Sequence, residues 1–180
     1  MPAGDARIGD DDADDRRRAI VRGVSLSDEN VAASLAPAGL IFVGRVEGPV
    51  RLPVDKPPAN CLPSDGRFDA DRVDLNDPGL AAKLNAQWWL MASQYGLLTF
   101  EREFLLLVDG EWVRVRLAAE WDLVGGESPA LASNFAGLFT RRYIPEFRML
   151  SLDGKMMLDT TVWGNGSIST IVIRPDRMIR

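Results

Sequence analysis

The chain has 180 residues, of which 46% are hydrophobic and 26% are charged, a composition typical of a folded domain rather than a disordered chain. Its formal net charge of −5, from 21 basic and 26 acidic residues, argues against a nucleic-acid partner, because phosphate binding requires concentrated positive charge. With no histidine and one cysteine, the sequence excludes histidine-dependent catalysis, an intramolecular disulfide and a cysteine-rich zinc site.

Residues 1–36 are predicted to form an extended, charged N-terminal arm. An acidic block at residues 10–15 is followed by three arginines at residues 16–18, and charge runs of this kind usually stay solvated. Ser27 is a suitable N-cap for a short helix that Pro37 would end.

Residues 37–180 are predicted to form a single domain that opens with a strand. The apolar run at residues 40–43 indicates this strand, and six of the 11 prolines follow between residues 49 and 78. Proline removes a backbone donor and disfavours both helices and central strands. We therefore expect a long proline-rich loop at about residues 51–77.

The clearest helix is predicted at about residues 78–95. Asp77 is a natural N-cap, Pro78 suits the first helical position, and Gly96 can end the helix. Apolar side chains recur between them at three- and four-residue spacing, so one face of this helix should pack against a sheet.

Asp109-Gly110 predicts a hairpin with a type I′ turn. The register that follows pairs Leu106 with Val113 on one face of the hairpin and Glu103 with Arg116 on the other. Apolar side chains meet on the first face and opposite charges meet on the second, as a real pairing requires.

A second meander is predicted from Asp153-Gly154 and Asn165-Gly166. The first of these turns would place Arg148 opposite Asp159, and the second would place Val162 opposite Ser169. Between the two meanders, residues 120–145 contain an apolar patch that the pattern leaves open between a short helix and an irregular strand. This patch comprises Leu131, Phe135, Leu138 and Phe139.

Three such turns between alternating segments predict a mainly β fold. The expected architecture is an antiparallel meander that forms a sandwich or small barrel, with one packed α-helix at about residues 78–95 and the extended N-terminal arm.

The sequence contains no complete catalytic constellation. Residues 126–130 resemble a nucleophile elbow, but Ala130 stands where the last glycine should be and no histidine is available. Cys61 likewise lacks an imidazole to activate it and is expected to be inert. We therefore predict no catalytic residue and no cofactor.

Acidic residues gather at two places without forming a specific motif. The aspartates of residues 65–74 could offer oxygens to calcium, but their spacing is not that of an EF-hand and two arginines lie among them. Glu120, Asp122 and Glu127 could supply a carboxylate pair, yet in a chain with 26 acids some proximity arises by chance. No metal site is predicted.

An interaction site is predicted at Trp88, Trp89, Leu107 and Trp112. Adjacent tryptophans on one helix cannot both face the core, so one should project towards a partner, a pocket or the proline-rich loop. Leu107 and Trp112 lie on the nominally outward face of the first hairpin, where something must cover them.

A pocket is the other predicted site. Arg102 would interrupt the inward face of the strand expected at residues 97–108, and a buried arginine needs an acid partner or an anionic ligand. A structural ion pair is the simpler explanation. The polar side chains expected to line such a pocket are Tyr95, Glu101, Arg102, Glu120 and Tyr143.

Two functions from different classes fit these patterns. The first is a non-enzymatic interaction or assembly protein, for example a structural component of a virion, a tail or a secretion machine, that self-associates or binds another protein. The alternative is a small β-barrel that binds an apolar small molecule, as a carrier or as a cyclase- or isomerase-type enzyme acting through pocket shape. The sequence does not decide whether the protein is an enzyme.

The N-terminal residues lack the basic and apolar regions of a secretory signal, and no apolar run is long enough to span a bilayer. A single unpaired thiol favours a reducing compartment. We expect a cytoplasmic protein without membrane insertion.

Overall fold

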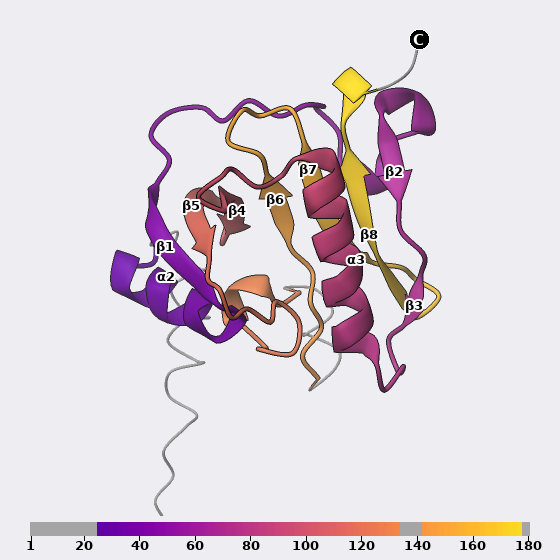
Figure 1. Ribbon diagram of the computed structural model, residues 1–180, viewed down its shortest axis with the longest axis horizontal. Helices are drawn as coiled ribbons and strands as arrows, with labels where there is room; N and C mark the ends of the chain where they lie inside the picture. Colours follow the sequence, from indigo (N-terminus) through magenta and orange to yellow (C-terminus); the bar gives the residue numbers. More distant parts are fainter. Residues whose placement is uncertain (1–24, 134–141, 178–180) are drawn as a thin grey trace, which may run out of the picture.

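The computed structural model describes residues 25–133 and 142–177, and the protein is built on one antiparallel sheet (Figure 1). The strands follow the order β1-β5-β4-β6-β7-β8-β2, and β3 pairs with the same edge of β8 as β2, nearer the start of β8. Their bounds are β1 (Leu40–Arg45), β2 (Arg67–Asp69), β3 (Val73–Asp74), β4 (Glu103–Val108), β5 (Glu111–Leu117), β6 (Arg148–Leu150), β7 (Met157–Val162) and β8 (Ser167–Ile173).

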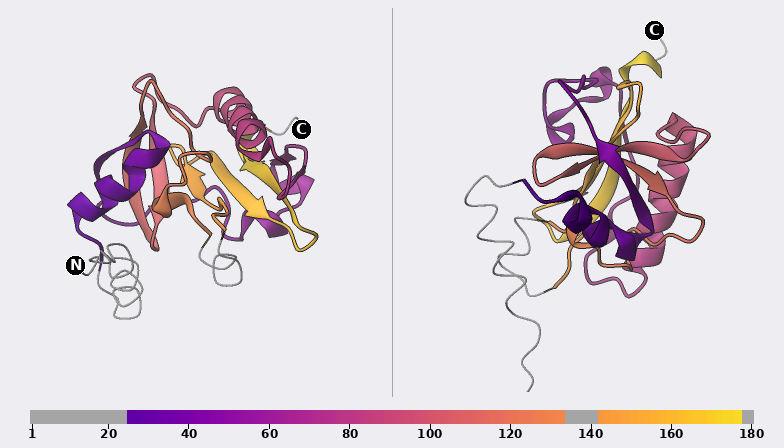
Figure 2. Two further views of the ribbon diagram at one scale, coloured as in Figure 1. Left: turned by 90° about the horizontal axis from the view of Figure 1, so that it is seen from below. Right: turned by 90° about the vertical axis from the view of Figure 1, so that its left-hand side faces the viewer.

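The predicted mainly β class is confirmed, but the sandwich or barrel is not. β1 and β2 stand at opposite ends of the strand order, so the sheet is not closed. Helices and loops, rather than a second sheet, cover its faces. Figures 1 and 2 show α3 (Leu80–Tyr95) across the half that holds β6, β7 and β8, and α2 (Asp28–Leu35) beside β1 at the other end.

Both helices form for local reasons that the sequence contains. Ser27 caps α2, its hydroxyl accepting from the Asn30 amide at 3.2 Å. α3 ends at Gly96, which adopts a left-handed φ of 76° that a residue without Cβ tolerates. The start of α3 differs from the prediction, because the Asp77 carboxylate accepts from the Gly79 amide at 2.7 Å and forms a turn before the helix begins.

One face of the sheet carries the main core. It joins side chains of both helices to the inward residues of β4, β5, β6, β7 and β8. The largest side chains without appreciable exposure in this cluster are Leu35, Leu84, Trp88, Leu97, Phe104, Leu106, Leu123, Leu131, Met149 and Met156. The space between the helices and the sheet is therefore filled by side chains.

The proline-rich loop and the residues just before it cover the opposite face. Val46, Val50, Val54 and Cys61 pack there in one apolar cluster with the outward residues of β4, β6, β7 and β8. Pro63 is followed by no proline before Pro78, and this proline-free part of the segment forms β2 and β3 at the sheet edge. The apolar outer face is thus covered in part by the chain itself.

The first two predicted registers are confirmed. Asp109 and Gly110 both have positive φ, 49° and 85°, as a type I′ turn requires. Leu106 lies opposite Val113 and Glu103 opposite Arg116. After the next turn, Arg148 lies opposite Asp159.

The register predicted for the third turn is wrong by one residue. Val162 lies opposite Ile168 rather than Ser169. Asn165 lacks the positive φ of a type I′ turn, whereas Gly166 has φ 79°, and the Trp163 amide donates to the Ser167 carbonyl at 2.7 Å. The loop therefore holds three residues instead of two, and every side chain of β8 faces the opposite side from the prediction.

The strand predicted from residue 97 begins later, at Glu103. Residues 97–102 form a turn, in which the Arg102 amide donates to the Thr99 carbonyl at 3.0 Å and the Thr99 amide donates to the Glu103 carbonyl at 3.2 Å. Phe100 is consequently not on the inward face of a strand, and Arg102 precedes β4 instead of interrupting it.

Two predicted segments are only partly described. Residues 1–24 of the predicted arm lie outside the described residues. The rest of the arm contains α2, which buries Val31 and Leu35 in the core. In residues 120–145, a 3₁₀ turn spans Pro129–Leu131 and Ala132 bridges to Pro145; Phe135, Leu138 and Phe139 lie outside the described residues. No helix in the described part of the chain has the length and apolar character needed to cross a membrane.

Candidate functional site

The four predicted interaction residues lie in different environments. Trp88 is buried in the core, whereas Trp89, one residue on, has 43% of its surface exposed. Trp112 is half-buried against the cluster under the proline-rich loop. Leu107 is half-buried and lines a cleft on the same face of the sheet. The structure therefore does not bring the four together on one surface.

Trp89 has Arg102 and Trp121 beside it. We group these three residues with their exposed apolar neighbours in sequence, Leu90 on α3 and Phe100 in the turn before β4, and call the group the aromatic surface. The Trp89 ring stacks on Trp121, with centroids 5.8 Å apart and planes 27° from parallel. Trp121 in turn meets buried Trp88 edge-on at 5.2 Å. The Arg102 guanidinium lies 5.7 Å from the centre of the Trp89 ring. The exposed tryptophan is thus held on the core by other aromatic rings.

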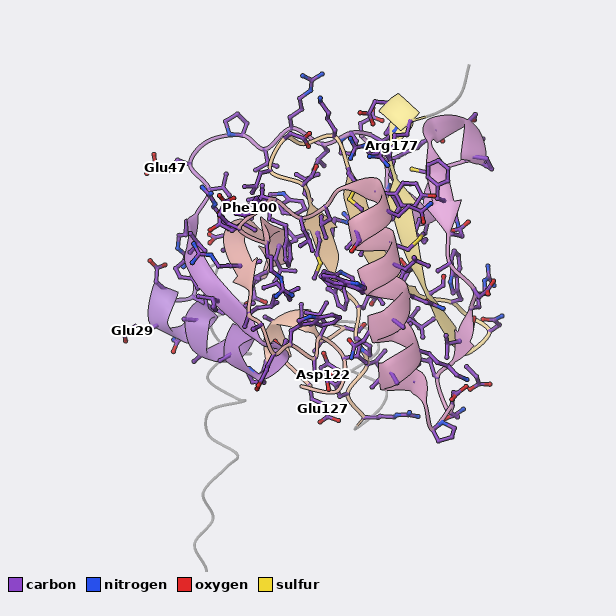
Figure 3. The ribbon with its side chains drawn as sticks, viewed as in Figure 1. Glu29, Glu47, Phe100, Asp122, Glu127 and Arg177 are labelled. Atoms are coloured by element: carbon purple, nitrogen blue, oxygen red, sulfur yellow. The ribbon has the colours of Figure 1, made fainter. Side chains whose placement is uncertain are left out.

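The turn before β4 exposes a phenylalanine almost completely. Phe100 is 98% exposed, and Leu90 on the outer side of α3 is 62% exposed. In Figure 3, Phe100 is set apart from Asp122 and Glu127. Arg102 in the same turn has φ 61°, a conformation that costs a non-glycine residue about 1–2 kcal/mol. The chain therefore maintains a strained turn whose result is an exposed aromatic side chain.

Only part of the predicted pocket lies near this surface. Glu101 precedes Arg102 and Glu120 precedes Trp121, and both glutamates are exposed. The Arg102 Nε atom is buried and has no hydrogen-bond partner. Tyr95 packs elsewhere, against Phe68 with ring centroids 4.7 Å apart.

The remaining predicted pocket residue, Tyr143, has a buried hydroxyl without a hydrogen-bond partner, and burial raises the pKa of this phenol well above its ordinary value. None of the five predicted pocket residues lines the cleft beside Leu107 or the hollow beside Arg45 and Trp112.

A cleft of about 370 Å³ lies where the ends of β4, β6 and β7 meet the proline-rich loop. An ion pair forms part of its lining: Arg148 Nε and Nη2 each donate to the Asp159 carboxylate at 2.9 Å. Burial, with a contribution from nearby Glu146, raises the pKa of Asp159, and Asp159 raises that of Arg148. The sequence predicted the pairing of these two residues but contained no signal for the cleft around them.

Three aspartates of residues 65–74 have side-chain partners within the chain. Asp65 pairs with Lys56 at 2.7 Å, Asp69 pairs with Arg67 at 2.9 Å, and Asp74 accepts from the Asn76 amide at 2.7 Å. Within residues 25–133 and 142–177, no three acidic or cysteine side chains gather as metal ligands would.

The serine of the segment that resembles a nucleophile elbow is buried and makes a structural hydrogen bond. Ser128 is fully buried, and its hydroxyl donates to the Ser34 carbonyl at 2.6 Å, which ties this loop to α2. Asp122 likewise accepts from the Gly125 amide and the Asn85 side chain, both at 2.6 Å.

Cys61 is buried, and burial raises the pKa of its thiol.

No family model, curated protein or solved structure matches this chain. The geometry of the described residues is therefore the basis for a functional proposal.

Proposed function

We propose that this protein is an interaction or assembly protein that associates with a second copy of itself through the aromatic surface. The observation that carries this proposal is Phe100, a phenylalanine that is 98% exposed on a strained turn. Trp89 and Leu90 add apolar area from α3. Aromatic side chains are enriched at the centres of protein interfaces, where removing one from water contributes about 2 kcal/mol.

The charges beside the aromatic surface favour a second copy as the partner. Glu101 and Arg102 are adjacent and of opposite charge. In a two-fold symmetric dimer, a surface meets the same surface of the other subunit, so Glu101 of each copy can face Arg102 of the other. The surface is in this sense complementary to itself.

Sedimentation equilibrium of the full chain over a wide concentration range tests this proposal. We expect a reversible dimer whose dissociation constant rises about tenfold or more in Phe100→Ser, as for the loss of an interface hot spot. The matched control is Leu62→Ser, which removes an exposed apolar side chain from the proline-rich loop, outside the aromatic surface. This variant should leave the dimer unchanged. A wild-type chain that stays monomeric at every concentration would contradict the proposal.

Binding of a small molecule is the second candidate function, and the cleft beside Arg148 and Asp159 is the observation that favours it. Because the sheet is not closed, such a ligand would lie in this open cleft rather than inside a barrel. Leu107→Trp should fill the cleft without removing the ion pair. A library of small polar metabolites should then raise the melting temperature of the wild type but not of this variant, and no rise in the wild type would exclude this candidate.

A further inference from the structure

The edge of the sheet at β1 has no neighbouring strand within the described residues, because β1 pairs with β5 alone. The right-hand view of Figure 2 looks onto this end of the molecule, where β1 lies beside α2. Buried Leu40 and half-buried Phe42 anchor the strand on the core. The edge is therefore a fixed part of the fold rather than a fraying end.

The pairing with β5 shows which backbone groups of β1 face outward. The Ala118 amide donates to the Gly39 carbonyl at 2.9 Å, and inward and outward residues alternate along an antiparallel strand. Ile41, directly opposite Arg116, therefore turns its backbone groups towards β5. Leu40 and Phe42 turn theirs away from the sheet, where a further strand can bind them.

The side chains on the outer face of this edge combine apolar and basic groups. Ile41 and Val43 are exposed on β1. On β5, Arg116 lies opposite Ile41 and Arg114 lies opposite Gly44. A Cβ built on Gly44 would meet no atom within 4 Å, so nothing on β1 at this position separates Arg114 from an incoming strand.

The local charge on this face is positive although the whole chain is acidic. The side chains of Arg114 and Arg116 are each 48% exposed, whereas Glu103, to which both are bonded, is only 4% exposed. One buried carboxylate thus opposes two half-exposed guanidinium groups. A partner that approaches from solvent meets a net charge of +1 beside two apolar side chains.

We propose that the β1 edge binds an extended acidic segment of another protein by strand addition. The backbone of the segment pairs with the outward groups of Leu40 and Phe42, and its acidic side chains reach Arg114 and Arg116 on the outer face. The register shift between Phe42 and Gly44 interrupts the edge, so the added ladder is short and the charges supply much of the specificity.

A second copy of the chain is the less suitable occupant of this edge. Two β1 strands paired to each other would bring two Arg114 and two Arg116 side chains onto one continuous face, against only two copies of Glu103. Like charges disfavour that assembly, whereas an acidic segment neutralises each face separately.

A fluorescein-labelled peptide of alternating valine and aspartate, capped at both ends, is a suitable probe for the full chain. We expect saturable binding by fluorescence anisotropy that weakens as salt is added. The same peptide with lysine in place of aspartate should bind about tenfold or more weakly. Hydrogen exchange should slow at the Leu40 and Phe42 amides when the acidic peptide is present. No binding, equal binding of both peptides, or unchanged exchange at these amides would overturn the proposal.

A matched pair of variants at Ile41 tests the site without disturbing the core. Ile41→Asp gives Arg116 an acidic partner within the chain and repels the peptide, so its dissociation constant should rise about tenfold or more. Ile41→Thr keeps a β-branched, uncharged residue and should change the dissociation constant of the peptide less than threefold. Equal effects of the two substitutions would contradict the role of charge.

Phe100→Ser separates this inference from the proposed function, since it should weaken self-association about tenfold or more and leave peptide binding intact. If exchange at the Leu40 and Phe42 amides slows with protein concentration alone, the occupant is a second copy and the inference is wrong.

Discussion

The Glu103 carboxylate accepts a hydrogen bond from Arg116 Nη2 at 2.7 Å on the outer face of the first hairpin. Arg114 donates to the other carboxylate oxygen, from its Nε at 2.8 Å. The two arginines, Arg116 first, hold the pKa of Glu103 below its ordinary value of 4.5. Folding is therefore linked to the ionisation of this group.

This linkage predicts how stability depends on pH. Because the folded-state pKa of Glu103 is lowered, its contribution is complete above about pH 4.5 and is lost as pH falls through the lowered value. We expect the urea midpoint of the wild type to fall over this acidic range, and that of Glu103→Gln to fall less. Asp55→Asn, at an exposed position, is the control and should follow the wild type. Parallel curves for all three proteins would contradict the prediction.

The type I′ turn predicts a glycine requirement at one position. Gly110 has φ 85° and open space around its Cα, so Gly110→Ala is opposed only by backbone conformation and should cost about 1 kcal/mol in the free energy of unfolding. Gly164 also has open space but lacks a positive φ. Gly164→Ala should stay within about 0.5 kcal/mol of the wild type by urea denaturation, and equal losses would argue against the turn geometry.

The packing of α3 predicts a large contrast between two leucines on the same helix. Leu84 is buried in the main core, whereas Leu90 is 62% exposed. Leu84→Ala should lower the free energy of unfolding by about 2–5 kcal/mol, the range for creating a cavity in a core. Leu90→Ala should lower it by less than about 0.5 kcal/mol. A loss at Leu90 as large as that at Leu84 would show that α3 is rotated from its described orientation.

The single thiol should be protected by the fold. Cys61 is buried and donates weakly to the Pro57 carbonyl at 3.6 Å, and burial raises its thiol pKa. We expect slow reaction with a chromogenic disulfide reagent in the native protein and rapid reaction in urea. Cys61→Ser combined with Ser64→Cys moves the thiol to an exposed position three residues away and should react rapidly in both conditions. Rapid reaction of the native wild type would indicate that the proline-rich loop opens.

Local sequence signals identified much of the secondary structure. Ser27 and Gly96 act at helix ends through bonds and backbone angles within a few residues, and Asp109-Gly110 sets its register through two adjacent positive φ angles. The register predicted from Asn165-Gly166 was wrong because two-residue and three-residue loops both accept this pair. In the observed register, Ile168 and Val172 pack into the main core, which the dipeptide alone does not specify.

The candidate site was less accessible to prediction. That Trp88 and Trp89 face different environments follows from helix geometry, and the apolar stripe of the helix contains Trp88, which is the buried one. Phe100 continues an apolar pattern that is typical of a strand, so its exposure was not predicted. The chain turns at Phe100 instead, with a positive φ at Arg102, and an arginine carries no local signal for that conformation.

By itself the sequence determined the mainly β class, the positions of the turns and the absence of any imidazole, since each depends on residue identity or on interactions between near neighbours in the chain. Only the tertiary structure decided that the sheet stays unclosed, that a proline-rich loop covers its outer face, and that β1 leaves an edge beside Arg114 and Arg116. These outcomes depend on how segments far apart in the chain bury one another's apolar side chains, and the free energy of that burial is shared across the whole core rather than carried by any local motif.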